Sequence, residues 1–94
     1  MTNLLIRHKV NDYDVWRSAF DSFAETRKSS GEQSFQIYRP AEDGNNLHLL
    51  FEWDNVENAK KFLDSPILKE TMQKAGVIEA PEIKFFGEAY TGKL

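Results

Sequence analysis

The strongest constraint on the fold is the order in which two hydrophobic periods alternate along the chain. Four segments repeat apolar side chains every second residue, as strands do, and two repeat them at helical spacing. The order is strand, helix, strand, strand, helix, strand, which is that of a ferredoxin-like domain. We therefore predict one α+β domain over residues 1–94, with a four-stranded antiparallel sheet and both helices on one face.

Turn residues bound the predicted strands, which cover residues 4–10, 34–39, 47–53 and 83–88. Residues 40–46 carry the strongest turn signal of the chain, so the second and third strands should form a hairpin. Right-handed crossovers are expected to bring the first and third strands side by side at the centre of the sheet, running parallel.

Two amphipathic helices are predicted. The first runs from Tyr13 to a stop signal at residues 29–31, and its inner stripe continues through Trp16, Phe20 and Phe23 to Arg27. The second begins after residues 54–55 and is interrupted just before Pro66. Because proline suits the first position of a helix, the chain should resume there and continue to a glycine stop at position 76.

Composition excludes several classes of function. The net charge is −3 and the basic residues are scattered, which argues against a nucleic-acid partner. The absence of cysteine excludes disulfides, thiolate catalysis and cysteine metal sites. The apolar run before Arg7 is only three residues long, too short for a signal peptide, and no apolar run approaches a membrane span. We expect a cytoplasmic protein without a membrane partner.

The sheet face turned away from the helices is predicted to mix charges with large apolar side chains. Leu50, Tyr38 and Phe86 should lie on this face beside Arg7 and Glu52. A small domain has a modest core, and a bare face with such residues is poorly suited to water. The pattern favours a homodimer in which two sheet faces pack together, with basic side chains of one chain meeting acidic ones of its partner.

Four stretches carry a resemblance to a known family: residues 5–10 (LIRHKV), 14–16 (DVW), 50–54 (LFEWD) and 59–66 (AKKFLDSP). With them the whole chain resembles the dimeric α/β-barrel superfamily, and within it small proteins grouped with the antibiotic biosynthesis monooxygenases. The resemblance implies a ferredoxin-like protomer that pairs through its sheet and has a ligand cavity between sheet and helices. It does not imply one reaction, because the superfamily includes quinone-forming monooxygenases, haem-degrading enzymes and isomerases.

The haem-degrading branch is marked by an asparagine on a strand and by a tryptophan and a histidine on the second helix. The matching positions here hold His8, Phe62 and Met72, so the axial histidine is missing. Because His8 and His48 should point to opposite sheet faces, a shared metal site is not expected either. We predict no metal and no other cofactor.

His8 is the main catalytic candidate. Alternation turns it toward the helices from the first strand, where an imidazole can act as general acid or base, or polarise a carbonyl. The alternative is a buried imidazole bonded to the backbone or to a neighbouring side chain. If the first and third strands run parallel, Trp53 lies at the same end of the sheet as His8, near Trp16 on the first helix.

A pocket formed by these three residues would suit a small hydrophobic or aromatic ligand. Its remaining walls are predicted to be Tyr13, Phe62, Met72 and Phe85. The alternative for such aromatic side chains is simple core packing, which we assign to Phe20, Phe23 and Phe51.

Three functions are compatible with the sequence, which leaves open whether the protein is an enzyme. The first is a monooxygenase-like enzyme without a cofactor, acting on an aromatic or quinone-like molecule with His8 as base. The second is a non-catalytic binding module for a hydrophobic metabolite. The third is a structural or stress-related dimer that holds no ligand. The first two rank almost level, because few polar groups converge on the predicted pocket.

Overall fold

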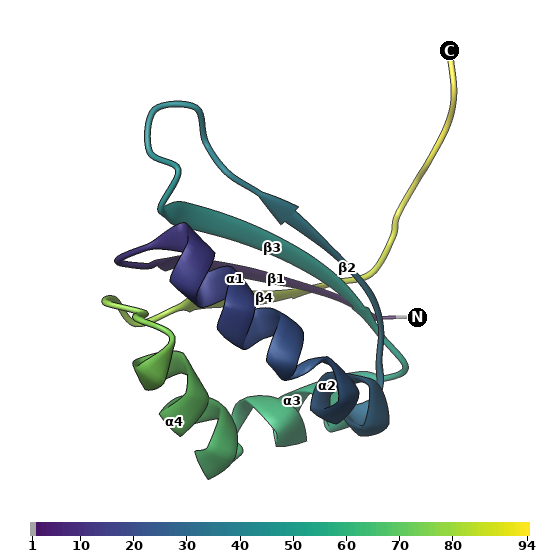
Figure 1. The fold of residues 1–94 in the computed structure, drawn as a ribbon. Coiled ribbons are helices and arrows are strands. Elements are labelled where there is room, and N and C mark those ends of the chain that lie inside the picture. The colour runs from purple at the N-terminus through teal and green to yellow at the C-terminus, as the bar shows by residue number, and fades with distance from the viewer. Residues whose placement is uncertain (1) are drawn as a thin grey trace.

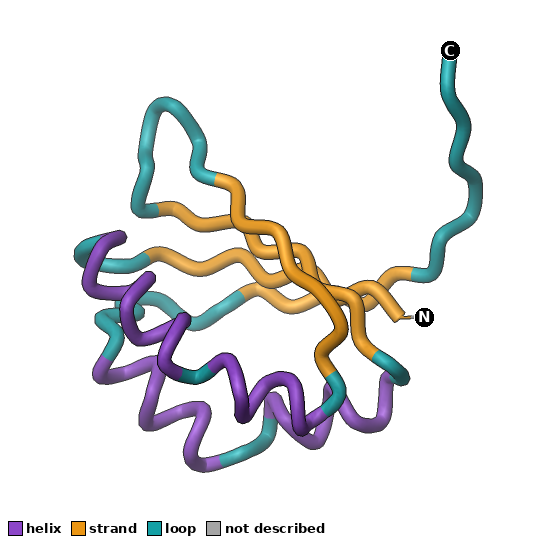
Figure 2. Tube along the Cα trace, turned by 45° about the vertical axis from the view of Figure 1, so that its right-hand side comes forward, coloured by secondary structure: helices purple, strands orange, loops and turns teal. Residues whose placement is uncertain are grey.

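The computed structural model describes residues 2–94 as a sheet covered on one face by helices (Figure 1). The elements in chain order are β1 (Thr2–Lys9), α1 (Tyr13–Ser22), α2 (Ala24–Ser30), β2 (Glu32–Tyr38), β3 (Asn46–Trp53), α3 (Val56–Leu63), α4 (Pro66–Lys74) and β4 (Glu82–Phe86). Figure 2 shows all the helices on the same side of the strands. The predicted ferredoxin-like order and the one-sided helical layer are confirmed.

The sheet has the strand order β2-β3-β1-β4, and every neighbouring pair is antiparallel. The first and third strands are therefore adjacent, as predicted, but the prediction that they run parallel is wrong. A strand–helix–strand crossover makes β1 and β2 parallel, and the hairpin after β2 reverses the direction of β3, which lies between them. As a result Trp53 pairs with Thr2, while His8 pairs with Leu47 near the other end.

The first predicted helix is divided at Phe23 into α1 and α2, so the prediction of one continuous helix is wrong at this position. The Phe23 amide donates to the Phe20 carbonyl in a tighter turn, at 3.2 Å. That carbonyl also accepts from the guanidinium of Arg27. The bend therefore gives the inward-turned arginine a backbone partner.

The second predicted helix is divided as expected, and α4 begins with Pro66 at its first position. None of the helices within residues 2–94 is long and apolar enough to cross a membrane.

The core lies beneath the helices on the two central strands. Its strand side chains alternate along the sequence and are each at most 5% exposed: Leu4, Leu47, Leu49, Phe51 and Trp53. The edge strands are less covered. Phe35 on β2 and Ile83 on β4 lie on the same covered face but are 43% and 41% exposed. An edge residue has a neighbouring strand on one side only, so the same alternation buries less of it.

Gly31 ends α2 with φ +126°, a backbone conformation that residues with a Cβ rarely adopt. A Cβ built there would lie 2.5 Å from a carboxylate oxygen of Asp54. The chain therefore needs glycine at this turn, both for its backbone and for the close approach of the β3–α3 connection.

Gly31→Ala should lower the free energy of unfolding by about 1–3 kcal/mol, through backbone strain and the clash with Asp54. The matched control is Gly92→Ala, because a Cβ at position 92 meets no atom of the described residues within 4 Å. Urea unfolding of the two variants and the parent protein, all at one protein concentration, measures the difference. Equal midpoints for the two variants would contradict this account of the turn.

Candidate functional site

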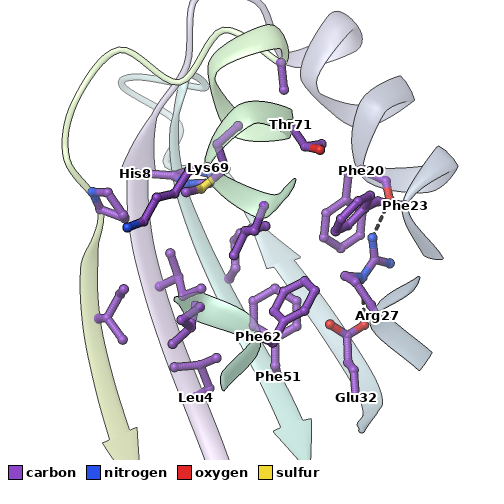
Figure 3. A pocket seen from close by; sticks show the side chains of 18 of the residues that line it. Leu4, His8, Phe20, Phe23, Arg27, Glu32, Phe51, Phe62, Lys69 and Thr71 are labelled. Atoms are coloured by element: carbon purple, nitrogen blue, oxygen red, sulfur yellow. Dashed lines mark hydrogen bonds and ion pairs between the residues drawn. The ribbon is translucent and has the colours of Figure 1, made fainter. Parts of the chain in front are cut away.

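A cavity of about 300 Å³ lies between the sheet and the helices. Most of its lining is apolar, and its ionisable side chains lie at two ends (Figure 3). His8 of β1 and Lys69 of α4 are at one end, and Arg27 of α2 with Glu32 of β2 is at the other. Cavities of this size can enclose a small organic ligand.

Most of the sequence-predicted site residues lie on the wall of this cavity: His8, Trp16, Trp53, Phe62 and Met72. Tyr13 and Phe85 do not. The ring of Tyr13 is covered by the guanidinium of Arg39, whose Cζ lies 3.7 Å from the ring centroid. Phe85 lies on the edge strand β4, outside the cavity wall. Periodicity placed both on the correct side of the sheet but could not show what covers them.

His8 is 4% exposed, and its imidazole packs edge-on against Trp16 with ring centroids 5.7 Å apart. Neither Nδ1 nor Nε2 has a hydrogen-bond partner in residues 2–94, so the expected alternative of a bonded imidazole is not found there. Burial, with a smaller contribution from the charge of Arg7, lowers the pKa of His8 to about 4. The ring is therefore neutral near pH 7, with one nitrogen free to accept and the other free to donate.

Trp53 lies far from His8 along the strands. It pairs with Thr2 on one side and Glu32 on the other, at the Arg27–Glu32 end of the cavity. Its indole is 1% exposed and packs on Phe62 with centroids 5.2 Å apart. The predicted cluster of His8, Trp16 and Trp53 at one mouth is thus wrong, because the antiparallel pairing separates the two indoles.

Sequence reasoning missed the ion pair between Arg27 and Glu32. The Arg27 Nε donates to Glu32 Oε2 at 3.0 Å, and the two side chains are only 6% and 7% exposed. Burial raises the pKa of Glu32, and the bond from Arg27 opposes that rise. Arg27 carried a signal, since it continues the apolar stripe of the first helix. No pattern in the sequence marked Glu32 as a cavity residue, because its position depends on the chain reversal at Gly31.

The three phenylalanines assigned to simple core packing, Phe20, Phe23 and Phe51, also line the cavity. Phe20 stacks on Trp16 with centroids 4.9 Å apart, and the Arg27 Cζ lies 3.6 Å from its centroid. These rings are therefore both core and cavity wall. The space between the two polar ends is bounded by aromatic rings, among them Phe20, Phe51 and Phe62, together with aliphatic side chains (Figure 3).

His8 and His48 lie on opposite faces of the sheet, since His48 pairs with Arg7, the neighbour of His8 in β1. Within the part of the chain that the structure describes, no three His, Asp or Glu side chains are grouped closely enough to hold a metal ion.

A family model for antibiotic biosynthesis monooxygenases matches residues 6–74, and the chain belongs to this family. Its fold is similar to that of SnoaB from Streptomyces nogalater, described as a cofactor-independent oxygenase. SnoaB is 15% identical, with a TM-score of 0.77 over 96% of this chain and 94% of SnoaB. A conserved protein from Methanosarcina mazei is 17% identical, with a TM-score of 0.71 over 94% and 92% of the two chains. No curated protein matches the sequence.

Family membership and the cavity together define a monooxygenase-like protein of the kind that handles small molecules. They do not favour the alternatives of a binding module without catalysis or a structural dimer without a ligand.

The stability of the protein should fall as the pH is lowered from about 6.5 to about 4. In this window the unfolded chain protonates His8 while the buried imidazole stays neutral, so the unfolded state binds more protons. The shift corresponds to about 3 kcal/mol of unfolding free energy. His8→Phe should remove this part of the pH dependence, and His48→Phe, on the other sheet face, should retain it.

Urea titrations at several pH values and one protein concentration measure this dependence. If His8→Phe loses as much unfolding free energy at acid pH as the parent protein, His8 is not the source of the pH dependence.

Proposed function

We propose that this protein is a cofactor-independent monooxygenase-like enzyme that acts on a planar hydroxylated aromatic or quinone-like molecule. The main support is a neutral His8, without a hydrogen-bond partner among residues 2–94, at one end of an apolar, partly aromatic cavity of about 300 Å³. The shared fold with SnoaB, a cofactor-independent oxygenase, supports the same reaction class.

In such a reaction the substrate itself supplies the electrons. Loss of a proton from a hydroxyl or an activated carbon makes the aromatic system electron-rich enough to react with oxygen. One oxygen atom then enters the substrate, and the other leaves as water. The protein needs an apolar space for the ring system, a base for the proton and a polar group near the developing oxyanion.

His8 is the proposed base. Its neutral imidazole has a nitrogen without a hydrogen-bond partner in residues 2–94, and this nitrogen can accept a proton from a ligand bound in the cavity. The low pKa makes it a weak base while the cavity is empty. A deprotonated ligand changes this, because the imidazolium formed then faces an anion, and their attraction offsets the cost of burying the charge.

The aromatic walls are proposed to position the ligand. Trp16 already lies against His8 and stacks on Phe20, so a flat molecule in contact with His8 extends along these rings. Trp53 and Phe62 form the wall at the Arg27–Glu32 end of the cavity, and Met72 is a further lining residue. Tyr13 and Phe85 have no part in this proposal.

His8→Ala should reduce oxygen uptake with anthrones and hydroxyquinols by about 100-fold or more, because a positioned base contributes at least that factor. The effect should fall on kcat rather than on KM. In the parent protein kcat/KM should decline on the acid side near pH 4, where the free imidazole becomes protonated. His48→Ala is the matched control and should keep parental turnover.

Unchanged turnover in His8→Ala would remove His8 from the mechanism. Tryptophan quenching by these compounds without oxygen uptake would instead identify a binding module.

We also propose that the whole chain acts as one cytoplasmic domain that pairs with a second copy through its bare sheet face. Leu5 and Leu50 are opposite each other on the central strands, and both point away from the cavity. At the edges of the same face, Tyr38 is 53% and Phe86 45% exposed. Such a row of apolar side chains on one sheet face is suited to burial against another sheet.

The charges on this face are arranged differently from the expectation of basic and acidic residues meeting across a dimer. Arg7 is already bonded within its own chain, to Glu82 at 2.9 Å and to Asn46 at 2.7 Å. Glu52 likewise accepts from Ser34 at 2.9 Å. The apolar row, rather than new ion pairs, is therefore the main attraction in the proposed dimer.

Leu50→Glu should convert the proposed dimer to a monomer, since it buries an unpaired carboxylate in the apolar row. Light scattering coupled to size-exclusion chromatography should give twice the chain mass for the parent protein and one chain mass for this variant. Ile67→Glu, at a position 62% exposed on α4, is the control and should stay dimeric. A dimer in both variants would place the interface elsewhere.

A further inference from the structure

The Arg27–Glu32 pair at the far end of the cavity has no role in the proposed reaction. Its carboxylate is incompletely bonded: Glu32 Oε2 accepts from Arg27, but Oε1 is buried and has no hydrogen-bond partner among residues 2–94. The side chain is only 7% exposed and lines the cavity. A buried carboxylate oxygen that accepts no hydrogen bond is unfavourable, and such oxygens are rare in native proteins.

Arg27 is held in a position from which it serves only one of these oxygens. Its Nε donates to Glu32, its Nη1 donates to the Phe20 carbonyl, and its Cζ lies 3.6 Å from the Phe20 ring centroid. These three contacts fix the plane of the guanidinium. Within residues 2–94 the second oxygen of Glu32 is therefore free to accept from a donor inside the cavity.

The two polar ends of the cavity are far apart. His8 pairs with Leu47, whereas Glu32 pairs with Trp53, six residues further along β3. This is a separation of about 20 Å between the backbones of the two positions, and both side chains extend inward from there. Figure 3 shows aromatic rings, including Phe51 and Phe62, along the space between. A ligand that reaches both ends is therefore elongated, and flat rings within it can pack against these side chains.

We propose that Glu32, held by Arg27, is a specificity site that accepts a hydrogen bond from a hydroxyl group at the end of the ligand remote from His8. The inference rests on the proposed function, because it assigns the same cavity as the binding site. A hydroxyl is favoured over an ammonium group, since Arg27 already balances the charge of the carboxylate. A ring edge without a donor leaves Oε1 unpaired and binds less well.

Equilibrium binding of three unreactive anthraquinones tests this site: 2-hydroxyanthraquinone, 2,6-dihydroxyanthraquinone and 2-hydroxy-6-methoxyanthraquinone. Calorimetry or tryptophan quenching should show that the parent protein binds the dihydroxy compound about tenfold or more tightly than the other two. A hydrogen bond to a charged group is worth at least this factor, which exceeds the statistical advantage of a symmetric ligand.

Arg27→Met/Glu32→Leu should abolish this preference while retaining binding. The double change removes both charges and fills their space with apolar atoms, so no lone charge is left buried. Glu32→Gln keeps the shape of the side chain and should reduce the preference. The matched control is Arg17→Met/Asp21→Leu, the same exchange at an exposed ion pair on α1, which should keep the parental preference.

Equal binding of the three compounds to the parent protein would overturn the inference, and it is the result expected if a water molecule satisfies Glu32. A preference that persists in the double variant would also overturn it. Neither result bears on the proposed reaction, which oxygen uptake tests separately. If none of the compounds binds the parent protein, the aromatic cavity of the proposed function fails together with this site.

Discussion

The antiparallel pairing of β1 with β3 is the interaction on which the rest of the molecule depends. It buries the alternating residues Leu4, Leu47 and Leu49 beneath the helices and so forms the centre of the core. It also determines which ends of the strands meet. Because β3 runs against β1, His8 and Trp53 lie at opposite ends, and the space beneath the helices is elongated, with a different polar group at each end.

Burial disfavours the charged form of both His8 and Glu32, but the two residues end in different charge states. Removing a group from water favours its neutral form, which lowers the pKa of His8 and raises the pKa of Glu32. His8 faces no opposite charge in the described chain and stays neutral. Glu32 has Arg27 at 3.0 Å, and this bond opposes the effect of burial. One apolar cavity therefore offers a neutral proton acceptor at one end and a paired, fixed charge at the other.

The sequence predicts the fold well because the periods of strands and helices follow directly from backbone geometry. Alternation also turned His8 inward correctly. The direction of the strands could not be predicted in the same way, because hydrophobic periodicity is the same in both directions. The mistaken parallel pairing therefore placed Trp53 next to His8. Arg27 stood in the apolar stripe of the first helix, but its partner Glu32 becomes its neighbour only through the turn at Gly31. Contacts across such a turn follow from three-dimensional packing and not from residue spacing.

The two faces of β1 connect the cavity with the proposed dimer surface. Successive residues of a strand point to opposite faces, so Arg7 lies on the bare face while His8 lies in the cavity. The charge of Arg7 nevertheless contributes to the low pKa of His8. Glu82, bonded to Arg7 at 2.9 Å, brings a compensating negative charge to the same face. The proton affinity of the imidazole in the cavity is therefore lowered mainly by burial and partly by a charge on the other side of the sheet.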